Sequence, residues 1–254
     1  MIGESMKSTE PISIREVKRE ARHLYHGHFK TAIKINIAPI IFTILNVITL
    51  LMMMYAIIMS FRGLSQMPSS AAATNDNDSA LQQVFSIVES VLSDAIQLIF
   101  IWTASWALIE WYENPKELPT FKDAFQIFNR GNFLHTLLLT IVQSMLIFLW
   151  TLLFIVPGIV KLFSYSQTYF AYKIDIENGT RQGQLTDYIK VSRRVMAGRK
   201  WELFLLELSF IGWHIIGILT GGLAYIYIVP YLNATRVSCS RHLFTLAMSE
   251  SVAV

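Results

Sequence analysis

Three ionisable side chains, Asp94, Lys161 and His214, fall inside long apolar runs of the sequence, where charged residues are otherwise sparse. Placing such a group in the hydrocarbon core of a membrane costs about 2.5–3.5 kcal/mol on insertion scales. A rise of about 1.5 Å per residue from the expected outer turns puts all three in the outer half of the membrane. Together they could bind a polar headgroup, relay a proton or neutralise one another, and we favour a structural salt bridge.

A second pair of opposite charges is expected nearer the inner face of the membrane. Glu207 lies about 8 Å along its helix from Glu202, and Arg236 lies about 20 Å from the outer turn that precedes it. The two side chains therefore reach a similar depth. We predict that Glu207 and Arg236 form an ion pair between two neighbouring spans.

Basic residues gather in the polar segment between two of the apolar runs. A cation held at headgroup level contributes about 1 kcal/mol of attraction to anionic lipid. The residues predicted to contact lipid headgroups are Lys190, Arg193, Arg194, Arg199 and Lys200. The same segment could serve as a docking surface, but lipid anchoring is the simpler interpretation.

Sequence signatures of enzymes and of cofactor sites do not occur in the chain, which has no phosphate-binding loop, zinc motif, serine elbow or haem motif. The single cysteine, Cys239, excludes an intramolecular disulfide and a thiolate metal cage. The formal net charge of +3 is too small to suggest nucleic acid as a partner. We therefore expect no catalytic residue, no metal and no cofactor.

The composition explains why polar groups are confined to so few positions. Of the 254 residues, 53% are hydrophobic and only 15% are charged, whereas soluble domains carry about 25% charged residues. The apolar residues are grouped in runs long enough to cross a hydrocarbon core of about 30 Å. These features predict an all-α, multi-pass protein with a single membrane domain, 1–254, and they exclude a soluble enzyme.

The first two spans are separated by a long polar segment. Apolar runs at 35–61 and 84–109 predict spans one and two, which form hairpin 1 over 35–109. Between them, 62–83 is rich in Ser, Asn and Asp and has no apolar period, as expected of an outer loop.

Two further apolar blocks, 134–174 and 203–239, are each about twice as long as one crossing requires. Each must fold back on itself, which makes them hairpins 2 and 3. Proline and glycine near the middle of a block permit such a turn. The predicted turn residues are Pro157 and Gly158 in the first block and Gly221 and Gly222 in the second. The total is six transmembrane helices in three hairpins.

The distribution of positive charge sets the orientation of these spans. Nineteen of the 21 Lys and Arg residues fall on the side of the two termini, and only Arg62 and Lys161 fall on the other side. The positive-inside rule therefore places both termini in the cytoplasm. The predicted cytoplasmic segments are 1–34, 110–133, 175–202 and 240–254. In a five-span alternative, the last apolar segment lies flat on the membrane and the C-terminus is outside.

Each hairpin follows a short segment of similar design. In 21–29, 125–133 and 192–201, a helical pattern of polar and apolar residues stops at a glycine, and an aromatic residue follows within three positions. This order is expected of a cytoplasmic interfacial amphipathic helix, its C-terminal cap and an aromatic membrane anchor. We predict three units, each an interfacial helix plus a hairpin, with three unrelated membrane-entry caps as the alternative.

Several motifs in the second half of the chain are specific enough to indicate a family. They are the run 154–161 with Tyr165-Ser166, the basic stretches 192–196 and 198–200, the segments 208–213 and 220–222, and Pro230-Tyr231. Through them the chain resembles, over almost its whole length, the bacterial integral membrane family catalogued as domain of unknown function 975. The resemblance implies a multi-pass protein of the bacterial plasma membrane, found mainly in Gram-positive bacteria and without a defined activity. A fainter similarity reaches the membrane domain attached to some glycerophosphodiester phosphodiesterases.

These features predict a non-enzymatic membrane protein that binds membrane lipid or a partner membrane protein, including a second copy of itself, and modulates cell-envelope function. The alternative is a small transporter or lipid translocator whose polar path runs between the hairpins through Asp94, Lys161 and His214. A polar cavity where the hairpins meet would favour that alternative. The sequence identifies no particular ligand.

Overall fold

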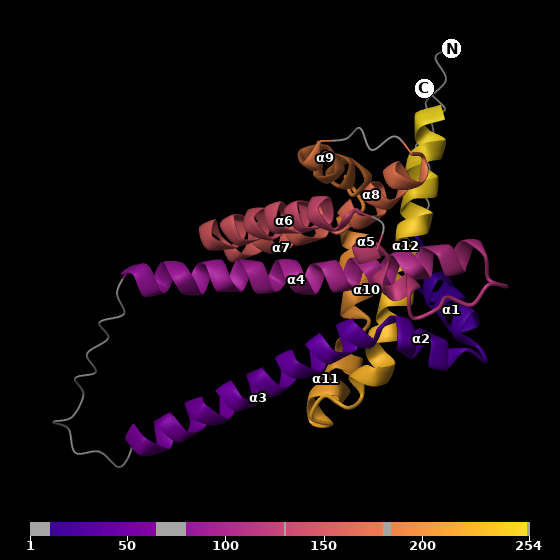
Figure 1. Ribbon diagram of the computed structural model, residues 1–254. Coiled ribbons are helices and arrows are strands. Elements are labelled where there is room, and N and C mark those ends of the chain that lie inside the picture. The colour runs from indigo at the N-terminus through magenta and orange to yellow at the C-terminus, as the bar shows by residue number, and fades with distance from the viewer. Residues whose placement is uncertain (1–10, 65–79, 130, 180–183, 253–254) are drawn as a thin grey trace.

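The computed structural model describes residues 11–64, 80–129, 131–179 and 184–252, and all regular structure in these residues is helical. The helices are α1 Ile14–Tyr25, α2 Phe29–Ile35, α3 Ile37–Leu64, α4 Ala80–Glu113, the short 3-10 helix η1 Asp123–Phe125, α5 Gln126–Asn129, α6 Phe133–Leu153, α7 Ile155–Tyr165, α8 Thr168–Glu177, α9 Leu185–Val195, α10 Lys200–Leu208, α11 Ile211–Leu219 and α12 Tyr225–Val252. Three helix pairs follow one another along the chain: α3 with α4, α6 with α7, and α10–α11 with α12. The first two pairs project from the same side of the compact part of the molecule (Figure 1).

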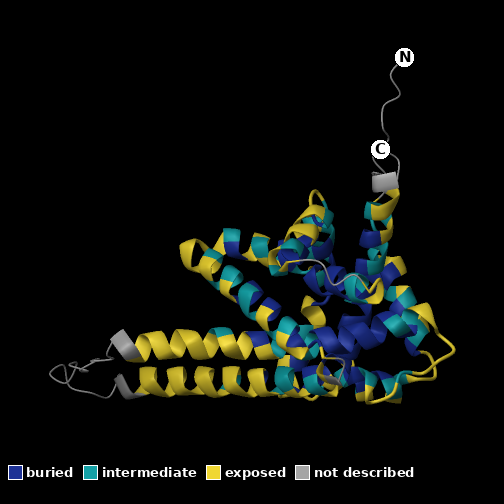
Figure 2. Cartoon of the chain, turned by 45° about the horizontal axis from the view of Figure 1, so that its top comes forward, coloured by how far each residue is buried: buried dark blue, intermediate teal, exposed yellow. Residues whose placement is uncertain are grey.

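Four stretches of the described residues are long and apolar enough to cross a membrane: Ile37–Arg62, Gln82–Glu113, Phe133–Leu153 and Lys200–Leu219. The projecting part of α3 and α4 is exposed along most of its length (Figure 2), and its exposed side chains are mainly hydrophobic. An apolar surface of this extent is unfavourable in water and suits lipid. The four helices therefore support a multi-pass membrane protein.

The other two predicted spans are not helices of this kind. Within 158–174, α7 ends at Tyr165 and α8 begins at Thr168, so α7 is about 16 Å long, roughly half of a hydrocarbon core. The last predicted span lies in α12, a helix of 28 residues that contains Pro230 and also extends over the predicted cytoplasmic tail. Length and hydropathy thus identify four crossing helices in the described part of the chain instead of six.

Helical structure extends further into the first predicted loops than expected. α3 continues to Leu64, and α4 begins at Ala80, so both enter the predicted outer loop 62–83. At its other end α4 continues to Glu113, inside the predicted cytoplasmic segment. Residues 80–83 read Ala-Leu-Gln-Gln, which are good helix formers, so nothing local stops the helix there. The rest of the predicted loop, 65–79, lies outside the described residues.

The turn between α6 and α7 lies earlier than predicted. α6 ends at Leu153, Phe154 has an extended backbone, and Pro157 and Gly158 fall in the first turn of α7. Proline suits this position because the first turn of a helix has N–H groups without intrahelical partners. Gly158 serves a different purpose, because a Cβ atom there would lie 2.5 Å from Oγ1 and 2.7 Å from Cα of Thr151. The glycine therefore permits the close contact of α6 and α7.

The three glycines of the repeated segments share one conformation. Gly27, Gly131 and Gly198 have φ angles of 79°, 67° and 82°, in the left-handed region that glycine adopts without strain. Each precedes the start of the next helix by two residues, at α2, α6 and α10. The predicted glycine caps are therefore confirmed. Gly221 and Gly222, between α11 and α12, also have positive φ angles of 62° and 97°.

The amphipathic helices direct their apolar faces toward protein, which differs from the predicted interfacial anchors. α1 packs on α12 and buries Val17, Ala21 and Tyr25. α9 packs mainly on α8, α6 and α7 and buries Tyr188 and Ile189. In the middle unit, η1 and α5 are too short to form an amphipathic helix of several turns. The apolar faces of α1 and α9 thus hold the helical bundle together.

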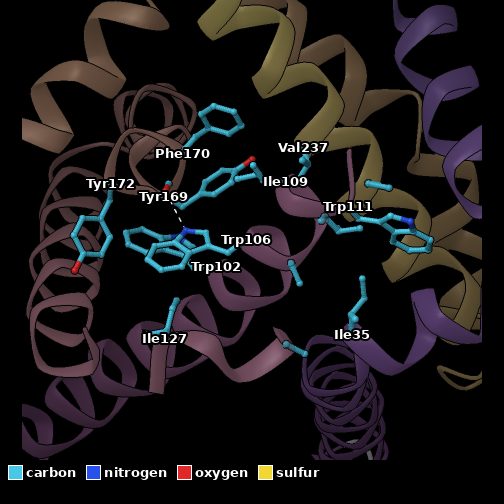
Figure 3. Packing of buried hydrophobic residues seen from close by; sticks show 14 of the residues in the cluster. Ile35, Trp102, Trp106, Ile109, Trp111, Ile127, Tyr169, Phe170, Tyr172 and Val237 are labelled. Carbon is cyan, nitrogen blue, oxygen red and sulfur yellow. Dashed lines mark hydrogen bonds between the residues drawn. The ribbon is translucent and has the colours of Figure 1, made fainter. Parts of the chain in front are cut away.

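The main hydrophobic core lies away from the projecting ends of α3 and α4 (Figure 2). In it, the indoles of Trp102 and Trp106 from α4 lie beside Tyr169 of α8, and Phe170 contacts the ring of Tyr169, with Trp111 further along α4 (Figure 3). Nε1 of Trp106 donates to the backbone carbonyl of Tyr169 at 3.2 Å. The core therefore fixes the position of α4 relative to α8. Both helices contribute to the wall of the candidate site.

Candidate functional site

The structure gives Asp94, Lys161 and His214 different neighbours instead of bringing them together. Nζ of Lys161 lies 4.3 Å from the ring centroid of Trp150. Nδ1 of His214 lies 3.1 Å from the hydroxyl of Tyr225. Asp94 lines a cavity that the other two do not reach. Similar depth along separate helices does not produce contact, because the rotation of each helix about its axis decides which way a side chain points. The predicted salt-bridge cluster is therefore not formed.

Glu207 and Arg236 do form a pair, which joins α10 to α12. Nε of Arg236 donates to Oε1 of Glu207 at 2.6 Å, and Nη2 donates to Oε2 at 2.8 Å. This two-pronged arrangement is the strongest geometry for a guanidinium and a carboxylate. The pairing is the one expected from the similar depth of the two residues.

A cavity of about 720 Å³ lies where the three helix pairs meet. Its volume is in the range of sites that hold small molecules. The apolar part of its wall includes Leu98, Ile101, Ile147, Phe148, Leu162 and Phe163. The polar part includes Asp94, Gln97, Ser105, Gln143, Thr151, Gln167, Glu207, Asn233, Arg236 and Ser240. Because α4, α6, α7, α10 and α12 all contribute, the site exists only when the three pairs are assembled.

Uncharged amides tie the helices around this cavity together. Nδ2 of Asn46 on α3 donates to Oε1 of Gln97 on α4 at 2.7 Å. Nδ2 of Asn233 on α12 donates to Oδ1 of Asn36, between α2 and α3, at 2.7 Å. Sequence reasoning missed these links because it considered only ionisable groups. The signal that could have found them is an Asn or Gln inside an apolar run, since a buried amide needs a partner.

A buried lysine is the other feature that the sequence did not reveal. Lys173 on α8 is 1% exposed. Its Nζ lies 2.6 Å from Oε1 of Glu110 and 3.1 Å from Oε1 of Glu177, and 5.1 Å from the ring centroid of Trp106. In the sequence, Lys173 is one of the 19 basic residues assigned to the side of the termini. Its place directly after the apolar and aromatic run 169–172 is a signal of burial. The cluster links α4 to α8.

The five basic residues predicted to contact lipid headgroups lie on α9 or at the start of α10. Nζ of Lys190 donates to Asp187 at 2.9 Å, and Nη1 of Arg199 donates to Glu202 at 3.3 Å. The hydrogen bond from Lys190, together with one from the backbone N–H of Gln184, lowers the pKa of the Asp187 carboxyl. The other three residues predicted to contact headgroups are Arg193, Arg194 and Lys200. Their contact with lipid stays a prediction.

A second cavity, of about 680 Å³, lies between α1 and α12. Glu20 of α1 accepts a hydrogen bond from the hydroxyl of Ser238, and its Oε1 lies 3.0 Å from Nε2 of His242. These contacts fasten α1 to α12. Over the parts of the chain that the structure describes, no group of three or more His, Cys, Asp or Glu side chains is arranged to hold a metal ion.

Comparison with known families identifies one match. Residues 159–244 match the family described as protein of unknown function (DUF975). The matched segment runs from α7 into α12 and includes Glu207 and Arg236. The resemblance inferred from the motifs in this half of the chain is therefore confirmed, whereas the similarity to the glycerophosphodiester phosphodiesterase membrane domain gains no support. Neither the curated proteins nor the solved structures yielded a match.

Proposed function

We propose that this is a non-enzymatic membrane protein that binds a membrane lipid in the cavity between its three helix pairs and thereby modulates the cell envelope. The observation that carries the proposal is the cavity of about 720 Å³, which combines an apolar wall with a polar lining. An acyl chain suits Ile101, Ile147 and the other apolar residues of the wall. A headgroup suits the polar part of the lining, which includes Asp94, Glu207 and Arg236.

The proposal includes a six-span topology with both termini in the cytoplasm. In this arrangement α7 and α8 together make the fourth crossing, and the first half of α12 makes the sixth. The distribution of basic residues supports it, because only Arg62 and Lys161 fall outside the predicted cytoplasmic side. Glu207 and Arg236 support it as well, because neutralising each other lowers the cost of placing both in the membrane.

Native mass spectrometry of the gently extracted protein tests the lipid-binding proposal. Ser144 on α6 lines the cavity and is 8% exposed, whereas its neighbour Met145 does not line it and is 61% exposed. We expect the protein to retain an adduct of lipid mass, Ser144→Phe to lose it by filling the cavity, and Met145→Phe to keep it. A retained protein subunit without lipid would support the partner-binding or homo-oligomeric function instead. An adduct unaffected by Ser144→Phe would contradict the proposed site.

A lipid translocator is the second candidate, and one observation favours it. The polar lining is contributed by all three helix pairs, as expected of a path between them. The path predicted from sequence needs revision, because only Asp94 of its three residues lines the cavity. Proteoliposomes with a headgroup-labelled fluorescent lipid distinguish the two functions. A translocator exposes lipid of both leaflets to an external quencher, whereas a binding protein leaves about half of the signal protected.

A further inference from the structure

We infer that the cavity accepts a lipid headgroup that donates hydrogen bonds and carries no net negative charge, such as an ethanolamine or a sugar headgroup. The inference rests on the proposed function, since it specifies which lipid the same cavity would bind. Three features of the lining carry it: the direction of its hydroxyl hydrogen bonds, the pairing of N–H groups of Arg236 and Asn233, and its charge.

Four hydroxyl groups of the lining have their proton committed to the backbone. Ser105, Thr151 and Ser240 each donate their proton to the backbone carbonyl four residues earlier in the same helix, at 2.7, 2.9 and 2.9 Å. Ser166 donates similarly to a carbonyl three residues earlier, at 2.8 Å. A hydroxyl has one proton and two lone pairs, so each of these groups has only acceptor capacity left. One lone pair of Ser240 already accepts from the hydroxyl of Tyr169, and one of Ser166 accepts from Nε2 of Gln167. A ligand that approaches them must supply the proton.

Two N–H groups of Arg236 and one of Asn233 are already matched within the protein. Nε and Nη2 of Arg236 donate to Glu207, so the positive charge of Arg236 faces a carboxylate. Nδ2 of Asn233 donates to Oδ1 of Asn36. An anionic headgroup would have to compete with Glu207 for the guanidinium, and separating a pair in a low-dielectric site is costly.

The net charge of the lining also disfavours an anionic headgroup. Asp94 also lines the cavity, and no cation is paired with it among the residues that the structure describes. The lining contains two carboxylates, Asp94 and Glu207, and one guanidinium, Arg236, which gives it an excess of one formal negative charge. Such a site repels a phosphate that lacks a compensating cation and attracts an ammonium group.

Lipid competition in detergent micelles tests this inference. The protein is mixed with equal amounts of phosphatidylethanolamine, a neutral diglycosyl diacylglycerol and phosphatidylglycerol, and bound lipids are identified by native mass spectrometry. Only the fraction lost in Ser144→Phe is counted, since basic residues on α9 can bind anionic lipid at the surface. One added charged hydrogen bond is worth about 1.4 kcal/mol or more, so we expect an enrichment on the order of tenfold over phosphatidylglycerol.

The variant Asp94→Asn identifies the donor. If the ammonium group is recognised, Asp94→Asn lowers binding of phosphatidylethanolamine and leaves the glycolipid unchanged. If sugar hydroxyls are recognised, the glycolipid dominates and is bound equally by Asp94→Asn. Either result supports the inference.

Two outcomes of this experiment separate failure of this inference from failure of the proposed function. A cavity-dependent fraction made mainly of phosphatidylglycerol would overturn the headgroup assignment and leave lipid binding intact. No cavity-dependent lipid of any class, as for a cavity that holds only water, would overturn both. If Ser144→Phe does not fold, Ile101→Trp is used instead, since it fills the cavity from α4. The double variant Arg193→Gln, Arg194→Gln is the surface control, and it removes only the anionic lipid bound at the surface.

Discussion

Lys173 shows what allows a charge to be buried in this protein. Its amine contacts two carboxylates, Glu110 and Glu177, and lies near the ring of Trp106, so the charge is compensated from two helices. Lys190, by contrast, pairs with Asp187 on the surface, where both side chains are largely exposed. Removing one partner of a buried pair leaves the other uncompensated, whereas exposed pairs contribute little.

Lys173→Met should therefore destabilise the protein by about 2–3 kcal/mol, because Glu110 and Glu177 lose their shared cation. Thermal unfolding in detergent measures the effect. The matched control, Lys190→Met, should change stability by less than about 0.5 kcal/mol. Adding Glu110→Gln to Lys173→Met should restore part of the loss. Equal effects of the two lysine substitutions would contradict the structural role of Lys173.

The pair of Glu207 and Arg236 leads to a second prediction at this scale. Glu207→Gln should lower stability by about 2 kcal/mol, less than for a fully enclosed pair because both side chains are partly exposed to the cavity. Arg236→Gln in the same protein should recover some of that loss, since it removes the unpaired charge. A double-variant cycle of thermal unfolding measures the coupling. A coupling energy near zero would show that the pair does not join α10 to α12.

At the scale of elements, the close contact between α6 and α7 depends on Gly158, which has no Cβ atom. A Cβ atom at Gly158 would overlap the backbone of Thr151, which cannot rotate away as a flexible side chain could. Thr151 also lines the cavity. Separation of the two helices would therefore alter the cavity wall.

Gly158→Ala should cost about 1–3 kcal/mol and should also reduce retention of lipid, because α6 and α7 must move apart. The control is Gly212→Ala on α11, where an added Cβ would meet nothing within 4 Å and should be neutral or slightly stabilising. Thermal unfolding and native mass spectrometry read the two effects. Unchanged stability of Gly158→Ala would show that the helices are less closely packed than described.

At the scale of the whole molecule, the apolar surface and the basic residues are separated. The exposed hydrophobic residues concentrate on α3, the first half of α4, the ends of α6 and α7, and α11. The basic residues lie mostly on α1, α9 and the ends of helices that join the compact region. This separation is expected if the projecting helices cross a membrane and the compact region meets the cytoplasm.

Cysteine labelling tests this orientation. Cys239 is buried, and Cys239→Ala gives a background without thiols. In that background, we expect Ser70→Cys to react with an impermeant maleimide in intact cells, and Lys190→Cys and Ser249→Cys to react only after permeabilisation. Labelling of Ser249→Cys in intact cells would instead establish the five-span alternative, with the C-terminus outside.

The sequence by itself determined the class of the protein, the approximate positions of four candidate crossing stretches and its glycine caps. These properties follow from hydropathy, charge and backbone conformation, which depend on residues close together in the chain. It also indicated that Glu207 and Arg236 share a depth, because depth follows from counting residues along a helix.

Only the tertiary structure decided which side chains meet. Lys161 lies over the ring of Trp150, and His214 contacts the hydroxyl of Tyr225. Of the three residues, only Asp94 lines the cavity. The burial of Lys173 and the cavity itself likewise depend on how α4, α6, α8, α10 and α12 are rotated and packed. Rotation about a helix axis is set by contacts between segments distant in sequence, and hydropathy along a nearly uniform apolar run carries too little directional information to fix it.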